Sequence, residues 1–108
     1  MKFGLSDDII QMFHSVFSRY PEVEEVIIYG SRAKGNYREG SDIDITLIGP
    51  ELTEDIRSQI WLDLDDLNHP YLFDLSIFES LNSENLKDHI RRVGKTFYLK
   101  EGAISRSQ

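Results

Sequence analysis

The sequence predicts an α/β protein (an α+β mixed sheet), with one domain in which helices cover a short mixed sheet. Segments whose apolar residues recur at helical spacing alternate with apolar runs at strand spacing, in the order α-β-α-β-α-β-α. This alternation is typical of a sheet packed by helices. A chain of 108 residues is long enough for one hydrophobic core and too short for two. We expect a single domain at 1–102 and a flexible C-terminal tail at 103–108.

The N-terminal segment predicts a helix followed by a strand. Ser6 precedes two acidic residues, which is the pattern of a helix N-cap with favourable charge in the first turn. Pro21 ends this helix. Residues 23–29 (VEEVIIY) predict a strand that leads directly into Gly30, and residues 31–34 are suited to a short helical turn. The buried face of the helix is formed by Ile9, Ile10, Phe13, Val16 and Phe17.

The middle of the chain predicts a second strand and a second long helix. Residues 41–48 form the strand, which Gly49 and Pro50 close. Thr53 caps the helix that follows. Asp63 and the acids beside it lie on the solvated face of this helix, because the buried stripe is formed by Ile56, Ile60, Leu64 and Leu67.

The last third predicts a strand, a helix and a short closing element. Residues 71–78 (YLFDLSIF) alternate in polarity, so that Asp74 and Ser76 lie on the face opposite to the apolar residues. Ser83 caps the helix, and Gly94 ends it. Residues 96–99 are either a short strand or a turn. The apolar stripe of this helix is formed by Leu86, Ile90 and Val93.

The composition excludes several classes of function. The chain has no cysteine, which removes disulfides, thiolate zinc sites and thiol nucleophiles. It has no apolar run long enough to span a membrane and no signal-peptide pattern, so a cytoplasmic location fits. The net charge of −7 argues against a general nucleic-acid binder. It suits a protein that binds a metal-complexed nucleotide or a basic protein partner.

The most informative feature is a glycine-serine turn followed by a pair of acids. Gly30 allows the backbone to approach a ligand closely, and Ser31 offers its hydroxyl to a phosphate. Asp42 and Asp44 then share one face of the second strand, because side chains alternate along a strand. Two parallel carboxylates repel each other unless a cation lies between them. Because Mg²⁺ is usually held by carboxylates plus substrate phosphates, the pattern predicts a nucleotide site. The core-facing residues of this strand are Ile43, Ile45 and Leu47.

A third carboxylate completes the predicted site if the second and third strands are neighbours. Asp74 would then converge on Asp42 and Asp44. Three carboxylates can hold the one or two Mg²⁺ ions used in phosphoryl transfer. One ion would position the triphosphate, and the other would lower the pKa of an attacking hydroxyl, with Asp74 as its ligand or as the general base.

The cations near the turn and on the last helix have two interpretations each. Arg32 and Lys34 either contact the phosphates or are simply exposed to solvent. A basic cluster on the last helix either grips the triphosphate or an acidic partner, or forms a solvated face. The three histidines lack metal-ligand spacing and are structural or exposed. The basic cluster consists of Lys87, Arg91, Arg92 and Lys95.

Taken together, residues 30–35 (GSRAKG), 41–45 (SDIDI) and 73–75 (FDL) resemble the signature of the DNA-polymerase-β-like nucleotidyltransferase superfamily. The short chain resembles its minimal nucleotidyltransferase (MNT) branch. The resemblance implies a nucleotidyltransferase fold and transfer of a nucleoside monophosphate from an NTP to a hydroxyl. It assigns phosphate binding to Gly30 and Ser31, and metal binding and catalysis to Asp42, Asp44 and Asp74.

The same resemblance implies a partner protein. Family members of this size are often encoded beside a HEPN-domain toxin and act as its antitoxin, and some transfer AMP to a tyrosine of that toxin. The predicted cofactors are therefore Mg²⁺ and ATP, and the predicted partner is a HEPN-domain protein. Two alternatives remain open: an antitoxin that only masks its partner, and a nucleotidyltransferase that acts on a small molecule such as an aminoglycoside.

Overall fold

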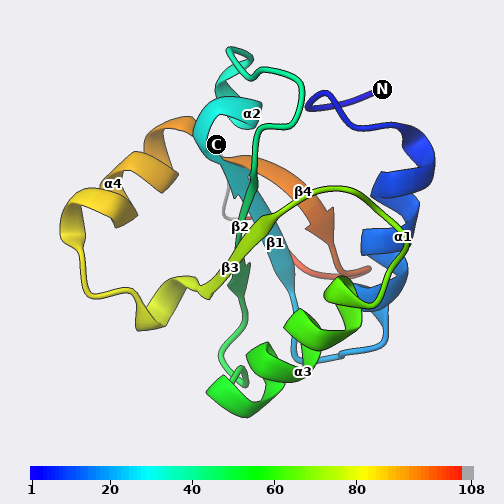
Figure 1. The fold of residues 1–108 in the computed structure, drawn as a ribbon. Coiled ribbons are helices and arrows are strands. Elements are labelled where there is room, and N and C mark those ends of the chain that lie inside the picture. The colour runs from blue at the N-terminus through cyan, green and yellow to red at the C-terminus, as the bar shows by residue number, and fades with distance from the viewer. Residues whose placement is uncertain (106–108) are drawn as a thin grey trace.

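The helices and strands of the computed structural model follow the predicted order, and the predicted mixed sheet packed by helices is confirmed (Figure 1). The structure describes residues 1–105. Its elements are α1 (Asp7–Ser18), β1 (Glu25–Tyr29), α2 (Gly30–Lys34), β2 (Ile43–Ile48), α3 (Glu54–Asp65), β3 (Phe73–Ile77), the 3₁₀ turn η1 (Phe78–Ser80), α4 (Glu84–Val93) and β4 (Lys95–Leu99).

The three longer helices begin where their capping residues predicted. The hydroxyls of Ser6, Thr53 and Ser83 each accept a hydrogen bond from the backbone N–H three residues later, at 3.3, 3.2 and 3.1 Å. The first three strands are shorter than predicted, and Asp42 lies just before β2 rather than within it. The closing element is a strand, β4, because it pairs with β1.

The sheet has the strand order β3-β2-β1-β4. β1 is antiparallel to both β2 and β4, whereas β2 and β3 are parallel. β2 and β3 can be parallel because the connection through α3 returns the chain to the end of the sheet at which β2 begins (Figure 1). As a result Asp44 in the middle of the sheet lies opposite Tyr29 on one side and Asp74 on the other.

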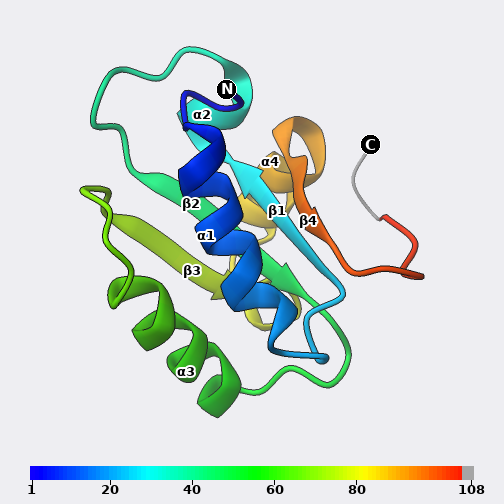
Figure 2. The same cartoon turned by 90° about the vertical axis from the view of Figure 1, so that its right-hand side faces the viewer.

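Helices cover both faces of this sheet. α1 and α3 lie on one face and α4 lies on the other (Figure 2). The main core forms under α1 and α3 and includes the predicted core residues of β2. A smaller apolar cluster under α4 also buries Ile48, and Thr46 is fully buried, which differs from the prediction of a single buried face. The second face is covered because α4 packs against β1 and the turn η1 packs against β2. The buried residues of the smaller cluster are Ile27, Tyr29, Ile48 and Ile90.

The chain after β4 turns back towards the sheet. The Ser105 hydroxyl donates a hydrogen bond to Glu25 Oε2 at 2.8 Å and lies 3.0 Å from the Thr96 hydroxyl. This part of the predicted flexible tail therefore has contacts with the sheet, and residues 106–108 lie outside the described residues. None of the helices within residues 1–105 has the length and apolar character needed to span a membrane.

Candidate active site

The turn between β1 and α2 brings the backbone against a carboxylate. Gly30 has a φ of +74°, in the left-handed region that favours glycine. A Cβ at this position would lie only 2.4 Å from Asp44 Oδ2. The Asp44 carboxylate therefore lies directly against the glycine, and a larger residue would displace it. The glycine turn and the second acid of the predicted pair are thus in direct contact.

Two of the predicted acids are direct neighbours across parallel strands. Asp44 on β2 is in register with Asp74 on β3, so the third strand does lie beside the second. Asp44 is half-buried, whereas Asp74 is exposed on the edge strand. Asp42 is exposed two residues before Asp44. The structure thus brings the three predicted carboxylates to one end of the sheet.

The electrostatics of this cluster are unfavourable without a cation. Burial raises the pKa of Asp44, and the negative charges of Asp74 and then Asp42 raise it further. The charge of His89 acts in the opposite direction. A raised pKa means that the ionised carboxylate is poorly compensated by the protein alone. A bound cation would relieve this repulsion.

Two further residues belong to the site. Tyr29 is buried opposite Asp44, and burial, followed by the charges of Asp74 and Asp44, raises its pKa to about 12. His89 on α4 packs edge-on against Tyr29, with ring centroids 6.3 Å apart at 83°. The sequence analysis assigned no chemical role to either residue. The sequence did indicate that His89 faces the sheet, because it lies three residues after Leu86 on the apolar stripe of this helix.

Arg32 has a structural environment that its sequence position did not reveal. Its side chain is only 2% exposed. Its Nε and Nη2 groups donate to the Ser41 carbonyl at 3.0 and 2.8 Å, and Nη1 donates to the Phe3 carbonyl at 2.8 Å. The guanidinium also lies over the rings of Tyr37 and Tyr71. The predicted phosphate contact of Arg32 would compete with these bonds, and it stays a prediction.

The glycine turn is held between neighbouring elements. α2 packs against β1 and α4, which fixes the backbone at Ser31 beside the acid cluster. The Ser31 carbonyl accepts hydrogen bonds from the N–H groups of Gly35 and Asn36 at 3.0 and 3.2 Å. Gly35 ends the helix with a φ of +86°. Lys34 is exposed, and its contact with the phosphates stays a prediction.

The basic cluster of the last helix is partly engaged in local contacts. The Lys87 ammonium and the Arg91 guanidinium lie over the Phe78 ring, at 5.7 and 5.4 Å from its centroid. Arg92 pairs with Asp88 at 3.0 Å. The acids of α3 are mainly solvated as predicted, except that Asp63 is half-buried and accepts a hydrogen bond from the Tyr20 hydroxyl. Neither group is shown to join the acid site.

The donor set fits a magnesium ion that arrives with a nucleotide. Within residues 1–105, no three His, Asp or Glu side chains are close enough to enclose a metal ion by themselves. Mg²⁺ does not need such a cage, because it usually binds one or two protein carboxylates and completes its shell with waters and substrate phosphates. Asp44 together with Asp42 or Asp74 can supply that number of ligands.

Comparison with known proteins connects this geometry to a family. The family model described as "Polymerase beta, Nucleotidyltransferase" matches residues 11–102. No significant match is found among curated protein sequences. Solved structures with the same fold include a toxin–antitoxin complex with AMP-PNP, at 22% identity and a TM-score of 0.66, over 90% of this chain and 76% of that one.

Two further solved structures have the same fold. One is a putative nucleotidyltransferase from Sulfolobus solfataricus, at 24% identity and a TM-score of 0.53, over 95% of this chain and 97% of that one. The other is a complex of the tri-AMPylated Shewanella oneidensis HEPN toxin with MNT antitoxin, at 19% identity and a TM-score of 0.56, over 85% and 74%. The family match spans most of the chain and contains the glycine turn and all three acids. This chain belongs to the polymerase-β nucleotidyltransferase family.

Proposed function

We propose that the protein is a Mg²⁺-dependent nucleotidyltransferase that transfers AMP from ATP to a hydroxyl of a partner protein. The observation that carries this proposal is the contact of the Asp44 carboxylate with Gly30, combined with its register opposite Asp74. This geometry supports a site in which the glycine turn and the paired acids contact one nucleotide. We further propose that the partner is a HEPN-domain toxin, which the protein neutralises as an antitoxin in the cytoplasm.

Each residue has a role in the proposed reaction. Gly30 and Ser31 bind the triphosphate through the backbone and the hydroxyl. Asp44, together with Asp42 or Asp74, would hold Mg²⁺, which supplies charge neutralisation of the phosphates and activation of the attacking hydroxyl when bound. The acceptor oxygen forms a bond to the α-phosphorus, the bond to the leaving pyrophosphate breaks, and the acceptor proton passes to Asp74. The buried phenol of Tyr29 stays protonated throughout, because its pKa is about 12.

One finding supports a protein acceptor. The similar solved structures include complexes of a toxin with an antitoxin, one of them with an AMPylated HEPN toxin. A masking antitoxin remains the second candidate, because the same fold occurs in those complexes. A small-molecule acceptor is the third, and it predicts turnover without any protein partner.

The proposal is tested with ATP labelled at the α-phosphate, Mg²⁺ and the product of the neighbouring gene as the candidate HEPN-domain partner. We expect label on that protein, loss of label with EDTA, and loss of label in the double variant Asp42→Asn/Asp44→Asn. The matched control is Asp65→Asn, an exposed acid on α3, which should retain transfer. A stable complex without any label would contradict the proposed transfer and favour masking.

A further inference from the structure

The face of the sheet that carries the acids is closed on one side and open on the other. Towards β1 it is bordered by α2 and α4 and by the packed rings of Tyr29 and His89. Towards β3 it ends, because β3 is the edge strand of the sheet. The glycine turn lies on the closed side. An acceptor that attacks the α-phosphate opposite to the leaving group therefore approaches over β3.

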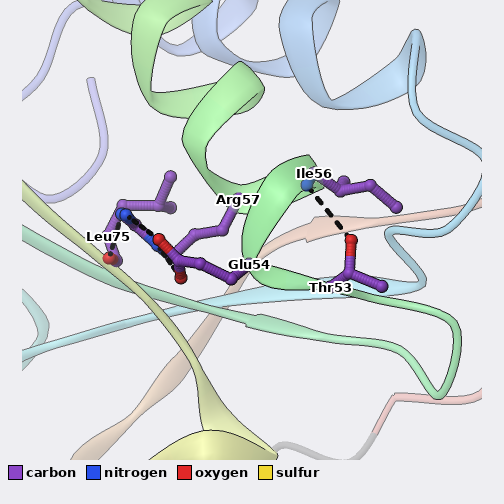
Figure 3. A network of polar contacts seen from close by, with 5 residues as sticks. All are labelled: Thr53, Glu54, Ile56, Arg57 and Leu75. Atoms are coloured by element: carbon purple, nitrogen blue, oxygen red, sulfur yellow. Dashed lines mark hydrogen bonds and ion pairs between the residues drawn. The ribbon is translucent and has the colours of Figure 1, made fainter.

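The outer edge of β3 is already occupied at its centre. Arg57 on α3 donates from Nη1 to the Leu75 carbonyl at 3.2 Å, and its Nε and Nη2 donate to the Glu54 carboxylate at 2.8 and 2.7 Å (Figure 3). This carbonyl is therefore not free to pair with an added strand. The acceptor segment must lie over the face of β3 rather than along its edge.

That face offers one apolar side chain beside the acids. Leu72 comes just before β3, and its carbonyl accepts a hydrogen bond from the Ile43 N–H at 3.0 Å, so its backbone is joined to the sheet. Its side chain is nevertheless 74% exposed. By strand alternation Leu72 shares the face of Asp74, two residues away, and by continuation of the register it lies beside Asp42.

The rest of the same face is committed to internal contacts. The Ser76 hydroxyl, on the other side of Asp74, donates to the Thr46 hydroxyl at 2.8 Å. Phe73 points to the opposite face, where its ring packs against those of Phe13 and Trp61. Leu72 is thus an exposed apolar group placed between two carboxylates at the open side of the site.

We propose that Leu72 contacts the acceptor and helps select it, an inference that rests on the proposed function. The occupant is the segment of the partner protein that carries the acceptor hydroxyl. Because Leu72 is apolar and lies beside the acids that would hold Mg²⁺, the matching segment has an apolar or aromatic group next to the acceptor hydroxyl. The net charge of −7 favours a segment that also carries basic residues.

The test compares Leu72→Ser with Leu62→Ser, a matched control in which a 55% exposed leucine on α3 is changed. The initial rate of labelled AMP transfer is measured against the concentration of the HEPN-domain partner, and the affinity for MgATP is measured by titration. Loss of one buried leucine contact predicts a rise of about 10–100-fold in the KM for the partner. The dissociation constant for MgATP should stay within about twofold. Leu72→Met, which keeps an apolar side chain, should restore most of the partner affinity.

Each other outcome overturns the inference in a recognisable way. If Leu72→Ser transfers AMP with the same KM for the partner as Leu62→Ser, Leu72 does not contact the acceptor. If Leu72→Ser weakens MgATP binding as much as partner binding, the leucine acts on the whole site rather than on the acceptor. If the wild-type protein transfers no label, the proposed function itself fails, which is distinct from the first two results.

Discussion

The two faces of the sheet are built from the same strands and serve opposite purposes. On the α1 and α3 face, Ile43, Ile45 and Leu47 are completely buried in one apolar core. On the other face, the intervening Asp44 is half-buried beside Asp74, in a position where burial and like charge work against ionisation. One face is optimised for packing, and the other retains charge repulsion that a ligand can relieve. Chemistry and stability are therefore divided between alternate residues of β2.

The acid-bearing face is itself divided along the strands. At one end α4 covers Ile27 and Ile48, which pack with Ile90. At the other end the acids meet the glycine turn and stay partly open to solvent. The apolar end anchors α4, and α4 in turn supplies His89 to the polar end. The site is thus held by packing that begins a few residues away on the same strands.

The largest expected effect follows from removing the charge of Asp44: this variant should lose activity and gain stability. Asp44→Asn should lower AMP transfer by about 10²–10³-fold, because the site loses a negatively charged ligand for the metal–phosphate complex. Its free energy of unfolding at pH 7 should rise by up to about 1 kcal/mol, because the repulsion with Asp74 disappears. Denaturation of both proteins by urea, together with the transfer assay, measures the two effects. A loss of both activity and stability would contradict the division.

The stability difference should depend on pH with a defined sign. The pKa of Asp44 is raised in the folded state, so the wild-type carboxyl group favours folding at low pH and loses that contribution as pH rises through the raised pKa. The asparagine of the Asp44→Asn variant does not titrate. The advantage of the variant should therefore be smallest below the ordinary pKa of 3.8 and reach its plateau near neutral pH. Unfolding curves at several pH values between these limits test the sign.

On the apolar face the effects should be reversed. Ile45→Ala removes a fully buried side chain from the main core and should lower the free energy of unfolding by about 2–5 kcal/mol. The folded fraction should still bind MgATP with nearly wild-type affinity, because Ile45 points away from the acids. Urea denaturation and nucleotide titration below the unfolding temperature check both statements. A large loss of MgATP affinity in the folded protein would show that the faces are coupled.

Gly30 lies between the buried strand β1 and the acid cluster. Its substitution should have a smaller effect than that of Asp44 or Ile45. Gly30→Ala would place a Cβ 2.4 Å from Asp44 Oδ2 and would strain a backbone with a φ of +74°. The backbone strain costs about 1–2 kcal/mol, and the displaced carboxylate should lower transfer by about 10–100-fold. Gly35→Ala is the matched control, because its φ is +86° but nothing lies within 4 Å of the added Cβ. Equal losses of transfer in both variants would argue against a role for the carboxylate contact.

Local patterns were sufficient for most of the fold and for the acid cluster. Hydroxyl caps, apolar spacing and strand alternation act over a few residues, so Ser6, Thr53 and Ser83 could be assigned directly. The convergence of Asp74 with Asp44 needed only the assumption that their strands are neighbours, which the parallel pairing confirms. The predicted ends of the strands were less accurate, because apolar residues such as Val23 lie beyond the last hydrogen-bonded pair of the strand.

The missed features depend on contacts between distant segments. Arg32 is buried because Phe3, Ser41 and two tyrosines surround it, and no periodic pattern links these positions. Thr46 is buried on the second face of β2, against which the turn η1 packs. Alternation within one strand cannot predict whether a helix from elsewhere covers its polar side.

Tyr29 combines a packed ring with a hydroxyl that faces the acid site, so both roles can be compared within one residue. Its ring belongs to the apolar cluster under α4, while burial and then the charges of Asp74 and Asp44 raise the pKa of its hydroxyl. Tyr29→Phe keeps the ring and removes only the hydroxyl, so it should lower transfer by only about 2–10-fold. Because the pKa of Tyr29 is about 12, the phenol stays neutral below about pH 10, and the pH–rate profiles of the two proteins should have the same shape there. A profile whose alkaline limb moves in Tyr29→Phe would mean that this tyrosine titrates during the reaction, and would place it among the catalytic acids and bases.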